Sequence, residues 1–293
     1  MNAYLLYASQ CELGEGPLWH TLRKTCFWVD IEEKRIFEFN QNSQRLKVWN
    51  TDKRISALFQ KTDGNLIVGF QGGIGEFSLQ TGQLKQLIEI EKDIISNRCN
   101  DGGCDIEGRV WIGTMENNCK PGAGKLYCIE NDLSIHIKLE NLCIPNGITW
   151  TFDQKHMYFI DSQSRQVKSF LFDSYTGHIE QEKTVIEIPE KLGMPDGMSI
   201  DEEGMLWIAH WGGFGVYRWN PLNGKLISKI HVPVPLVSSC SFAGDMLDQL
   251  IITTARKGLS KEELKQFPNS GDIFIASPGV KGMRLPYSQI GIN

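Results

Sequence analysis

Three side chains that carry oxygen donors occupy short motifs far apart in the chain: Glu15, Asn146 and Asp196. Glu15 lies between two glycines, whereas Asn146 and Asp196 each follow a proline and precede a glycine. Two carboxylates and an amide offer oxygen-only ligation with two negative charges, which suits Ca²⁺, Mg²⁺, Mn²⁺ or Fe²⁺. Three protein ligands leave positions for water and substrate, as in a catalytic metal site. The motifs therefore predict a hard-cation site if one closed fold brings them to a common point.

Each motif also has an ordinary structural explanation. A Glu between glycines is commonly a solvated turn residue, and Asn-Gly and Asp-Gly are frequent turn dipeptides. The combination is more informative than any member, because these residues lie at the same point of a repeated unit. A further short turn, at 97–101, lies at an equivalent point and contributes Arg98 and Asn100. We therefore expect four short turns to converge on one axis.

The elements that must position these turns are repeated β units. Each unit has an apolar β run, a polar turn and then an aromatic-rich strand, and the 29 glycines fit a chain with many turns. The unit starts lie roughly 40 to 50 residues apart, the range of a four-stranded propeller blade. In a propeller the loops at one end of the central channel converge. The units begin near Leu18, Ala57, Gly103, Ile148, Met198 and Cys240.

The sequence therefore predicts an all-β, six-bladed β-propeller with a central divalent-metal site, forming a single domain over residues 1–293. We expect the N-terminal strand, about 3–8, to complete the blade that holds 273–275, because closure protects sheet edges. An ordinary β-sandwich with coincidental spacing is the alternative. The one convincing helix runs over 260–266, with Ser260 as N-cap and Glu263 at the capping-box position.

Charge and composition exclude several function classes. The net charge is −5, and the basic residues are scattered rather than gathered in a stripe that would neutralise phosphates, so we expect no nucleic-acid partner. The N-terminus lacks a basic stretch followed by a long apolar one, and nowhere are about eighteen apolar residues consecutive. We predict a soluble, cytoplasmic protein with no membrane contact and no obligate protein partner.

Cysteine and histidine usage points away from other chemistries. Eight cysteines are present, but there is no C-x-x-C pair and the spacings match no zinc ribbon, so we predict reduced, mostly buried thiols. No G-x-S-x-G, H-E-x-x-H, P-loop or complete G-x-G-x-x-G occurs. The segment 103–114 lacks EF-hand ligands at its first and twelfth positions. Of the six histidines, His210 alone is a candidate to line the channel.

The motifs resemble those of the SMP-30/gluconolactonase/regucalcin family, whose members are six-bladed propellers with one divalent metal on the axis. Two later segments, 211–215 and 254–260, are more like those of bacterial sugar-acid lactonases, including xylonolactonase, than like those of the animal proteins. The matching motifs span nearly the whole chain in the family's order: Leu13 to Trp19, Asn97 to Gly102, Gly113 to Met115, Ile144 to Gly147, Phe159 to Ser162 and Pro195 to Gly197.

The resemblance implies a role for each candidate residue. Glu15, Asn146 and Asp196 would be the metal ligands, and Asp196 would also be the catalytic acid and base. Arg98 and Asn100 would bind the substrate's hydroxyls or its lactone group. The implied reaction is hydrolysis of a sugar lactone, such as xylono-, arabino- or gluconolactone, to the aldonic acid. The implied cofactor is one divalent metal ion: Fe²⁺, Zn²⁺, Mn²⁺ or Ca²⁺.

The chain departs from the family pattern at one substrate position. Animal members carry a substrate-binding Glu after Gly-Thr-Met, whereas an ungapped alignment puts Asn118 there and displaces Glu116 by two residues. We therefore expect Asn118 as a third substrate-binding residue and leave the sugar open. Asp161 ends a predicted strand and would either support the site from behind or cap its own turn.

Two other functions are compatible with the same residues. A phosphotriesterase-like or aryl-ester hydrolase is one, because a metal that polarises C=O would polarise P=O as readily. A non-catalytic metal-binding propeller is the other, since a fold does not fix a function.

Overall fold

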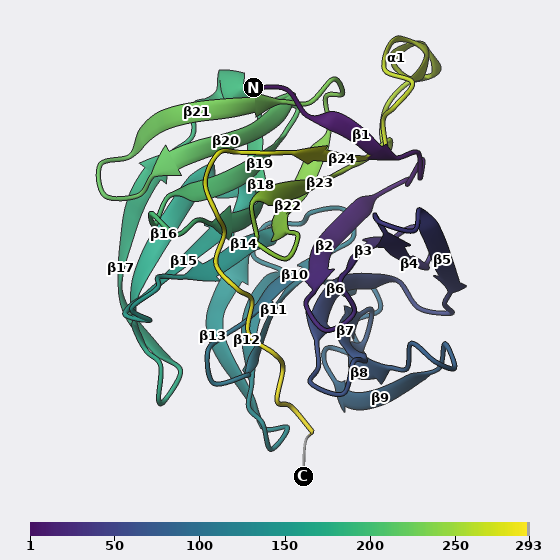
Figure 1. Ribbon diagram of the computed structural model, residues 1–293. Coiled ribbons are helices and arrows are strands. Elements are labelled where there is room, and N and C mark those ends of the chain that lie inside the picture. The colour runs from purple at the N-terminus through teal and green to yellow at the C-terminus, as the bar shows by residue number, and fades with distance from the viewer. Residues whose placement is uncertain (292–293) are drawn as a thin grey trace.

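The computed structural model describes residues 1–291 and has six four-stranded antiparallel sheets arranged as blades around a central axis (Figure 1). This confirms the prediction of an all-β, six-bladed propeller. Each innermost strand packs against the innermost strands of the two neighbouring blades, which closes the ring. From the axis outward the blades are β2 (Gly14–His20), β3 (Thr25–Asp30), β4 (Arg35–Asn40), β5 (Arg45–Asn50); β6 (Ile55–Gln60), β7 (Leu66–Phe70), β8 (Gly73–Phe77), β9 (Leu84–Glu89); β10 (Asn97–Cys104), β11 (Val110–Glu116), β12 (Gly124–Ile129), β13 (Ile135–Leu142); β14 (Pro145–Trp150), β15 (His156–Asp161), β16 (Gln166–Asp173), β17 (His178–Glu187); β18 (Met194–Ile200), β19 (Leu206–Trp211), β20 (Gly215–Asn220), β21 (Lys225–His231); and β22 (Val237–Ala243), β23 (Gln249–Thr254), β24 (Ile273–Ala276), β1 (Tyr4–Tyr7).

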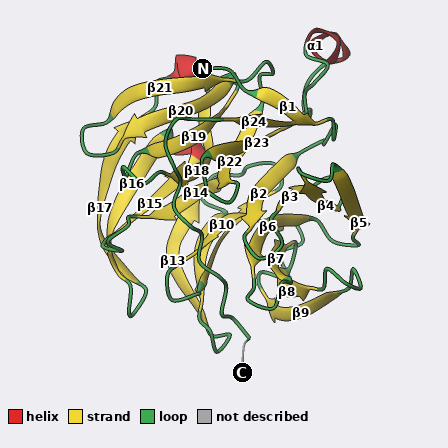
Figure 2. Cartoon of the chain, in the orientation of Figure 1, coloured by secondary structure: helices red, strands yellow, loops and turns green. Residues whose placement is uncertain are grey.

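The two termini of the chain share the sixth blade. β1 pairs antiparallel with β24, with Tyr4 opposite Ile275, as expected from the sequence. Two short 3₁₀ helices, Ser162–Ser164 and Glu190–Leu192, lie in loops. Helix α1 (Lys261–Gln266) stands off the ring in the loop between β23 and β24, with the predicted capping box (Figure 2). Within residues 1–291, no helix combines the length and apolar character needed to cross a membrane.

Burial explains why the second strand of each blade is apolar. All six residues of β3 are buried, and so are all five of β7, because neighbouring blades cover both faces of these strands. The outermost strands, such as β13 and β21, are mostly exposed. The hydrophobic core is therefore distributed between the blades, and the indoles of Trp28, Trp111 and Trp207 are among its largest fully buried side chains.

The polar turn of the repeat stabilises the indole that follows it. Asp105 accepts hydrogen bonds from the Trp111 indole nitrogen at 2.8 Å and from Arg109 Nε at 2.7 Å. The fifth blade repeats this arrangement, since Asp201 accepts from Trp207 at 2.9 Å and from Arg218 Nε at 2.8 Å. The third and fifth blades therefore share the same spacing of aspartate and tryptophan along the chain.

Every innermost strand has a register shift near its start, which sequence analysis did not predict. A bulge of this kind adds a residue to one strand and changes the direction of the neighbouring side chains. The shifts lie between Glu15 and Leu18, Ile55 and Ala57, Cys99 and Gly102, Asn146 and Ile148, Pro195 and Met198, and Val237 and Ser239. All six bulges lie at the same level of the channel, and the candidate site residues lie on four of them.

Candidate metal centre

The expectation that the site motifs form turns was wrong, because each lies inside an innermost strand. Glu15 is the second residue of β2, Asn146 the second of β14 and Asp196 the third of β18. The glycines after Asn146 and Asp196 are required by packing between blades. A Cβ on Gly147 would lie 2.5 Å from Met198 Cβ, and one on Gly197 would lie 2.0 Å from Ser239 Oγ. These glycines therefore allow the innermost strands to approach closely around the axis.

Two carboxylates of the predicted ligand set share one electrostatic environment. Burial raises the pKa of Glu15 well above its usual value, and the charge of Asp196 raises it further. Burial likewise raises the pKa of Asp196, together with the charge of Asp101. No salt bridge to either Glu15 or Asp196 is found in the described part of the chain. The fold thus concentrates acidic groups at the axis without giving them a protein cation as a direct partner.

The third predicted ligand, Asn146, belongs to a chain of hydrogen bonds that also contains both predicted substrate residues. Arg98 donates through NH1 to Asn100 Oδ1 at 2.6 Å and to the Cys99 carbonyl at 2.9 Å. Asn100 donates through Nδ2 to Asn146 Oδ1 at 3.1 Å and to the Pro145 carbonyl at 2.8 Å. β10 and β14 are therefore joined at the axis, and Arg98 and Asn100 are buried next to Asn146.

The amide of Asn146 is oriented from its other side by Ser162. Asn146 Nδ2 donates to Ser162 Oγ at 2.8 Å. Because the amide nitrogen has this partner, Oδ1 points toward Asn100 and keeps a second lone pair available for a cation. Ser162 follows the strand β15 and was quoted in the sequence motif, but it had no assigned role. A hydroxyl beside an amide in this position was not recognisable from spacing alone.

Two aspartates fix the chain segments that lead into the predicted ligands. Asp161, at the end of β15, accepts from the backbone nitrogens of Cys143 and Ile144 at 2.9 Å each. Asp30, at the end of β3, accepts from the backbone nitrogens of Glu12 and Leu13 at 3.0 and 3.2 Å. Asp161 therefore does not point at the site; it caps the loop that enters β14.

His210 does not line the channel. Its ring is fully buried and stacks on Tyr217 with the centroids 4.0 Å apart, and its Nδ1 lies 2.9 Å from the carbonyl of Leu192. Burial lowers the pKa of His210 to about 4, so the ring is neutral at pH 7. The histidine is a buried contact of the loop that enters β18.

Asn118 lies apart from the other predicted residues. It is exposed in the turn after β11, where its backbone nitrogen donates to Glu116 Oε2 at 2.7 Å. Among residues 1–291, no hydrogen bond joins Asn118 to Arg98, Asn100 or Asn146. Its substrate-binding role stays a prediction, and the structure supplies no contact in its favour.

Sequence reasoning missed Asp101. Burial raises the pKa of this carboxyl to about 6, and its Oδ1 accepts from the backbone nitrogen of Gly102 at 2.8 Å. Its charge raises the pKa of both Glu15 and Asp196, which places it beside the predicted ligands. The position of Asp101 directly after Asn100 could have identified it as a site residue. It was missed because an Asp-Gly pair is typical of a turn.

The donor chemistry of this centre fits a hard divalent cation. Glu15, Asn146 and Asp196 offer oxygen atoms only, and the two carboxylates have raised pKa values that a nearby cation would reverse. Within residues 1–291, no three His, Cys, Asp or Glu side chains are grouped closely enough to ligate a metal by themselves. A ligand set at this position therefore depends on the amide oxygen of Asn146. All eight cysteines are free thiols, and six of them are buried.

Comparison with known proteins agrees with the fold and the motifs. Residues 13–256 match the model of the SMP-30/Gluconolactonase/LRE-like region family. Regucalcin of Sus scrofa is 32% identical over 287 residues, covering 96% of both chains. The crystal structure of regucalcin from Agrobacterium tumefaciens, described as a calcium-binding protein, superposes with a TM-score of 0.94 at 28% identity, covering 98% of this chain and 97% of that one. These matches show the family, but they do not separate bacterial sugar-acid lactonases such as xylonolactonase from its other members. The chain belongs to the SMP-30/gluconolactonase family.

Proposed function

We propose that this protein hydrolyses a sugar lactone to the corresponding aldonic acid with one divalent metal ion held by Glu15, Asn146 and Asp196. The observation that carries the proposal is a pair of channel carboxylates that have no salt bridge within residues 1–291 and whose raised pKa values the charge of Arg98 offsets only in part, next to an amide that is hydrogen-bonded to Asn100. The family name includes gluconolactonase, which supports the same reaction class. The name of the Agrobacterium relative supports including Ca²⁺ among the candidate metals.

Asp196 is the proposed proton carrier. Hydrolysis forms a bond between a water oxygen and the lactone carbonyl carbon, and it breaks the bond between that carbon and the ring oxygen. Asp196 accepts the proton that the water loses and returns a proton to the ring oxygen as it leaves. A metal ion bound at this centre would supply Lewis acidity toward the carbonyl oxygen. The aldonic acid then ionises at neutral pH, so each turnover releases one proton.

Arg98 and Asn100 are the proposed substrate-binding groups. The guanidinium of Arg98 uses NH1 for Asn100 and the Cys99 carbonyl, which leaves its remaining N–H groups for vicinal hydroxyls. Asn100 is held by Pro145 and Asn146, so its position depends on the strand that carries a predicted metal ligand. Such rigid polar groups favour a hydroxylated substrate over an apolar ester. The proposed partner is thus a diffusible small molecule, handled in the cytoplasm without nucleic acid, membrane or a protein partner.

The experiment is a pH-indicator assay with chelated protein resupplied with Fe²⁺, Mn²⁺, Zn²⁺ or Ca²⁺. Xylono-, arabino- and gluconolactone are compared with paraoxon and phenyl acetate, and every rate is corrected for spontaneous hydrolysis. Metal-dependent acid release from a lactone supports the proposal and ranks the sugars. Turnover of paraoxon or phenyl acetate alone would favour the phosphotriesterase or aryl-esterase alternative. Metal binding without turnover of any substrate would favour a non-catalytic metal-binding propeller.

A further inference from the structure

The far end of the channel holds a cavity that the proposed reaction does not use. The cavity has a volume of about 750 Å³ and is lined by the later residues of all six innermost strands. Glu15, Asn146 and Asp196 are absent from its lining, because they lie near the starts of those strands. We call this space the far cavity. Its volume lies within the range of roughly 300–1,000 Å³ that is typical of small-molecule sites.

A C-terminal segment crosses the mouth of the far cavity. This strap, residues 282–286, begins where Gly282 donates to the carbonyl of Leu247 at 2.8 Å and Met283 donates to that of Ile200 at 3.4 Å. Beyond the mouth, Ser288 donates to the carbonyl of Gln60 at 2.9 Å. The strap thus runs from the fifth and sixth blades to the second blade, across the ring (Figure 1). It narrows the mouth but does not fill the cavity.

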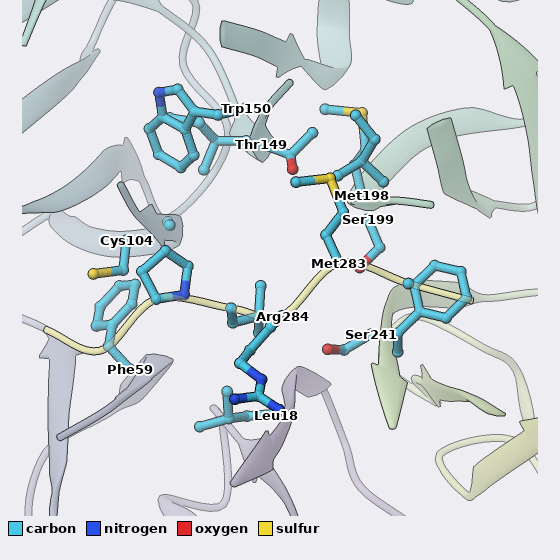
Figure 3. A pocket seen from close by; sticks show the side chains of 18 of the residues that line it. Leu18, Phe59, Cys104, Thr149, Trp150, Met198, Ser199, Ser241, Met283 and Arg284 are labelled. Atoms are coloured by element: carbon cyan, nitrogen blue, oxygen red, sulfur yellow. The ribbon is translucent and has the colours of Figure 1, made fainter. Parts of the chain in front are cut away.

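The walls of the far cavity are mainly apolar. Figure 3 shows Leu18, Phe59, Trp150 and Met198 around the space, with Met283 of the strap among them. Four hydroxyl side chains on the walls can accept or donate a hydrogen bond without carrying a charge: Thr149, Ser199, Ser239 and Ser241. The other polar lining side chains are the amides of Gln60 and Gln154 and the charged groups of Asp101, Asp105, Glu202 and Arg284. A ligand that fits these walls is predominantly hydrocarbon.

The mouth adds exposed apolar side chains to this lining. Phe152 is 84% exposed, and Ile106 and Leu285 are also exposed, although all three belong to the cavity's lining. Single exposed apolar residues are normal, but a group around the mouth of an apolar cavity is typical of a binding site. A ligand that enters the cavity would bury part of this surface, which favours binding through the hydrophobic effect.

One cation of the strap gives the ligand a polar end. Arg284 is exposed and lines the cavity, and Figure 3 shows its side chain extending from the strap toward Leu18. No salt bridge of Arg284 occurs within residues 1–291. Three carboxylates also line the cavity: Asp105, which is paired with Arg109 at 2.7 Å, Asp101, and Glu202, which is exposed. An anionic group is therefore favoured beside Arg284 and disfavoured beside Asp101 and Glu202.

We propose that the far cavity binds a small amphipathic carboxylate, with its hydrocarbon part inside the channel and its carboxylate at Arg284. The guanidinium can donate two parallel hydrogen bonds to such a group. The hydrocarbon contacts the aromatic and sulfur-containing walls, where its binding would change the fluorescence of Trp150. The lining of this site contains none of the three predicted metal ligands, although it reaches Asp101 beside them, and the inference does not depend on the proposed lactone hydrolysis.

The experiment titrates decanoate into metal-loaded protein while tryptophan fluorescence and heat are measured, with acetate and decanol as probes. We expect decanoate to bind with one site per chain, decanol to bind more weakly and acetate not to bind. Arg284→Gln should weaken decanoate by at least about tenfold, because it removes a charge-assisted pair of hydrogen bonds. Lys281→Gln is the matched control, since it removes the same charge from an exposed residue just before the strap and should change nothing.

A cavity-filling variant separates the two ends of the channel. Thr149 lines the far cavity and makes no side-chain hydrogen bond within residues 1–291, so Thr149→Phe should narrow the cavity and weaken decanoate binding. Decanoate should bind equally well to chelated protein. No saturable binding to the metal-loaded wild type would overturn the proposal. Binding that requires metal and is not weakened by Thr149→Phe would overturn it as well, because it would place the carboxylate at the metal centre.

Discussion

The two ends of the channel use buried carboxylates in opposite ways. At the far end, Asp105 and Asp201 each accept hydrogen bonds from an arginine and an indole. At the near end, Glu15 and Asp196 have no salt bridge within residues 1–291; burial and neighbouring carboxylates raise their pKa values, and the charge of Arg98 offsets this only in part. Burial also raises the pKa of Asp105, but its carboxylate is paired directly with Arg109. Both ends belong to the same strands and the same repeat. The difference lies in whether the protein itself supplies the counter-charge.

This difference separates structural from functional acids. A buried carboxylate with a fixed guanidinium stabilises its turn, and the pair needs nothing from outside. A partly buried cluster of carboxylates that no salt bridge neutralises is unfavourable in the empty protein, and this points to a ligand that carries positive charge. The comparison predicts that substitutions at the two ends have opposite effects on stability and on turnover.

The largest effect is expected at the near end. Glu15→Gln and Asp196→Asn should each lower the rate of lactone hydrolysis by on the order of a thousandfold or more, because each removes a predicted metal ligand. In chelator, both variants should melt at a higher temperature than the wild type, since the charged form of each carboxyl is disfavoured in the folded state. Turnover and chelated melting temperature are the two readouts. A variant that keeps full activity would remove its residue from the site.

At the far end we expect the opposite result, a loss of stability without a loss of turnover. Asp105→Asn leaves the 2% exposed guanidinium of Arg109 with only Glu130, at 4.0 Å, as a counter-charge and should destabilise the fold by about 3 kcal/mol in urea denaturation. Turnover per folded molecule should stay unchanged. Arg109→Met in the same chain should recover most of the stability, because it removes the stranded charge. Loss of turnover in folded Asp105→Asn protein would contradict the division between the two ends.

Sequence analysis predicted the polar turn and the aromatic-rich strand of the far end, but it did not predict the hydrogen bond between them. The aspartate of the polar turn and the indole of the next strand lie six positions apart in both Asp105 to Trp111 and Asp201 to Trp207. Their hydrogen bond is local in the chain, so a repeated spacing is enough to reveal it. The blade count and the capped helix are predictable for the same reason, since both follow from short-range signals, whereas the closing strand was predicted from the need to pair every sheet edge.

The near end was predicted less completely because its geometry depends on distant contacts. Asn146-Gly147 reads as a turn until Met198, from the next blade, is seen to exclude a side chain at the glycine. Asp101 becomes a member of the site only through the charges of Glu15 and Asp196 on other blades. Asn118 lies in an exposed turn, and its predicted role in substrate binding stays a prediction.

A smaller effect concerns acid stability. The pKa of His210 is lowered by burial to about 4 in the folded state, against about 6.5 in the unfolded chain. The unfolded chain therefore takes up a proton first as the pH falls, so stability is full above 6.5 and is lost toward 4. Between pH 7 and 5 the wild type should lose about 2 kcal/mol that His210→Phe does not lose. Urea titrations in chelator measure the difference, and parallel pH slopes would show that His210 does not titrate in this range.

The smallest effect tests whether the segments that lead into the innermost strands hold the predicted metal ligands in position. Asp161→Asn keeps the size of the side chain but replaces one acceptor oxygen by a donor, so the amides of Cys143 and Ile144 cannot both be satisfied. Asn146, two residues after Ile144, should then be held less firmly, and metal affinity should fall about tenfold while turnover at saturating metal changes little.

Asp153→Asn is the matched control. Asp153 is an exposed turn aspartate of the same blade, and it also accepts a backbone hydrogen bond, from Lys155, but it lies at the far end. Isothermal titration of both variants with the metal ion measures the two changes in metal affinity. Equal losses would mean that any weakened turn of this blade disturbs the centre, whereas a loss confined to Asp161→Asn would assign the positioning of Asn146 to the loop that Asp161 caps.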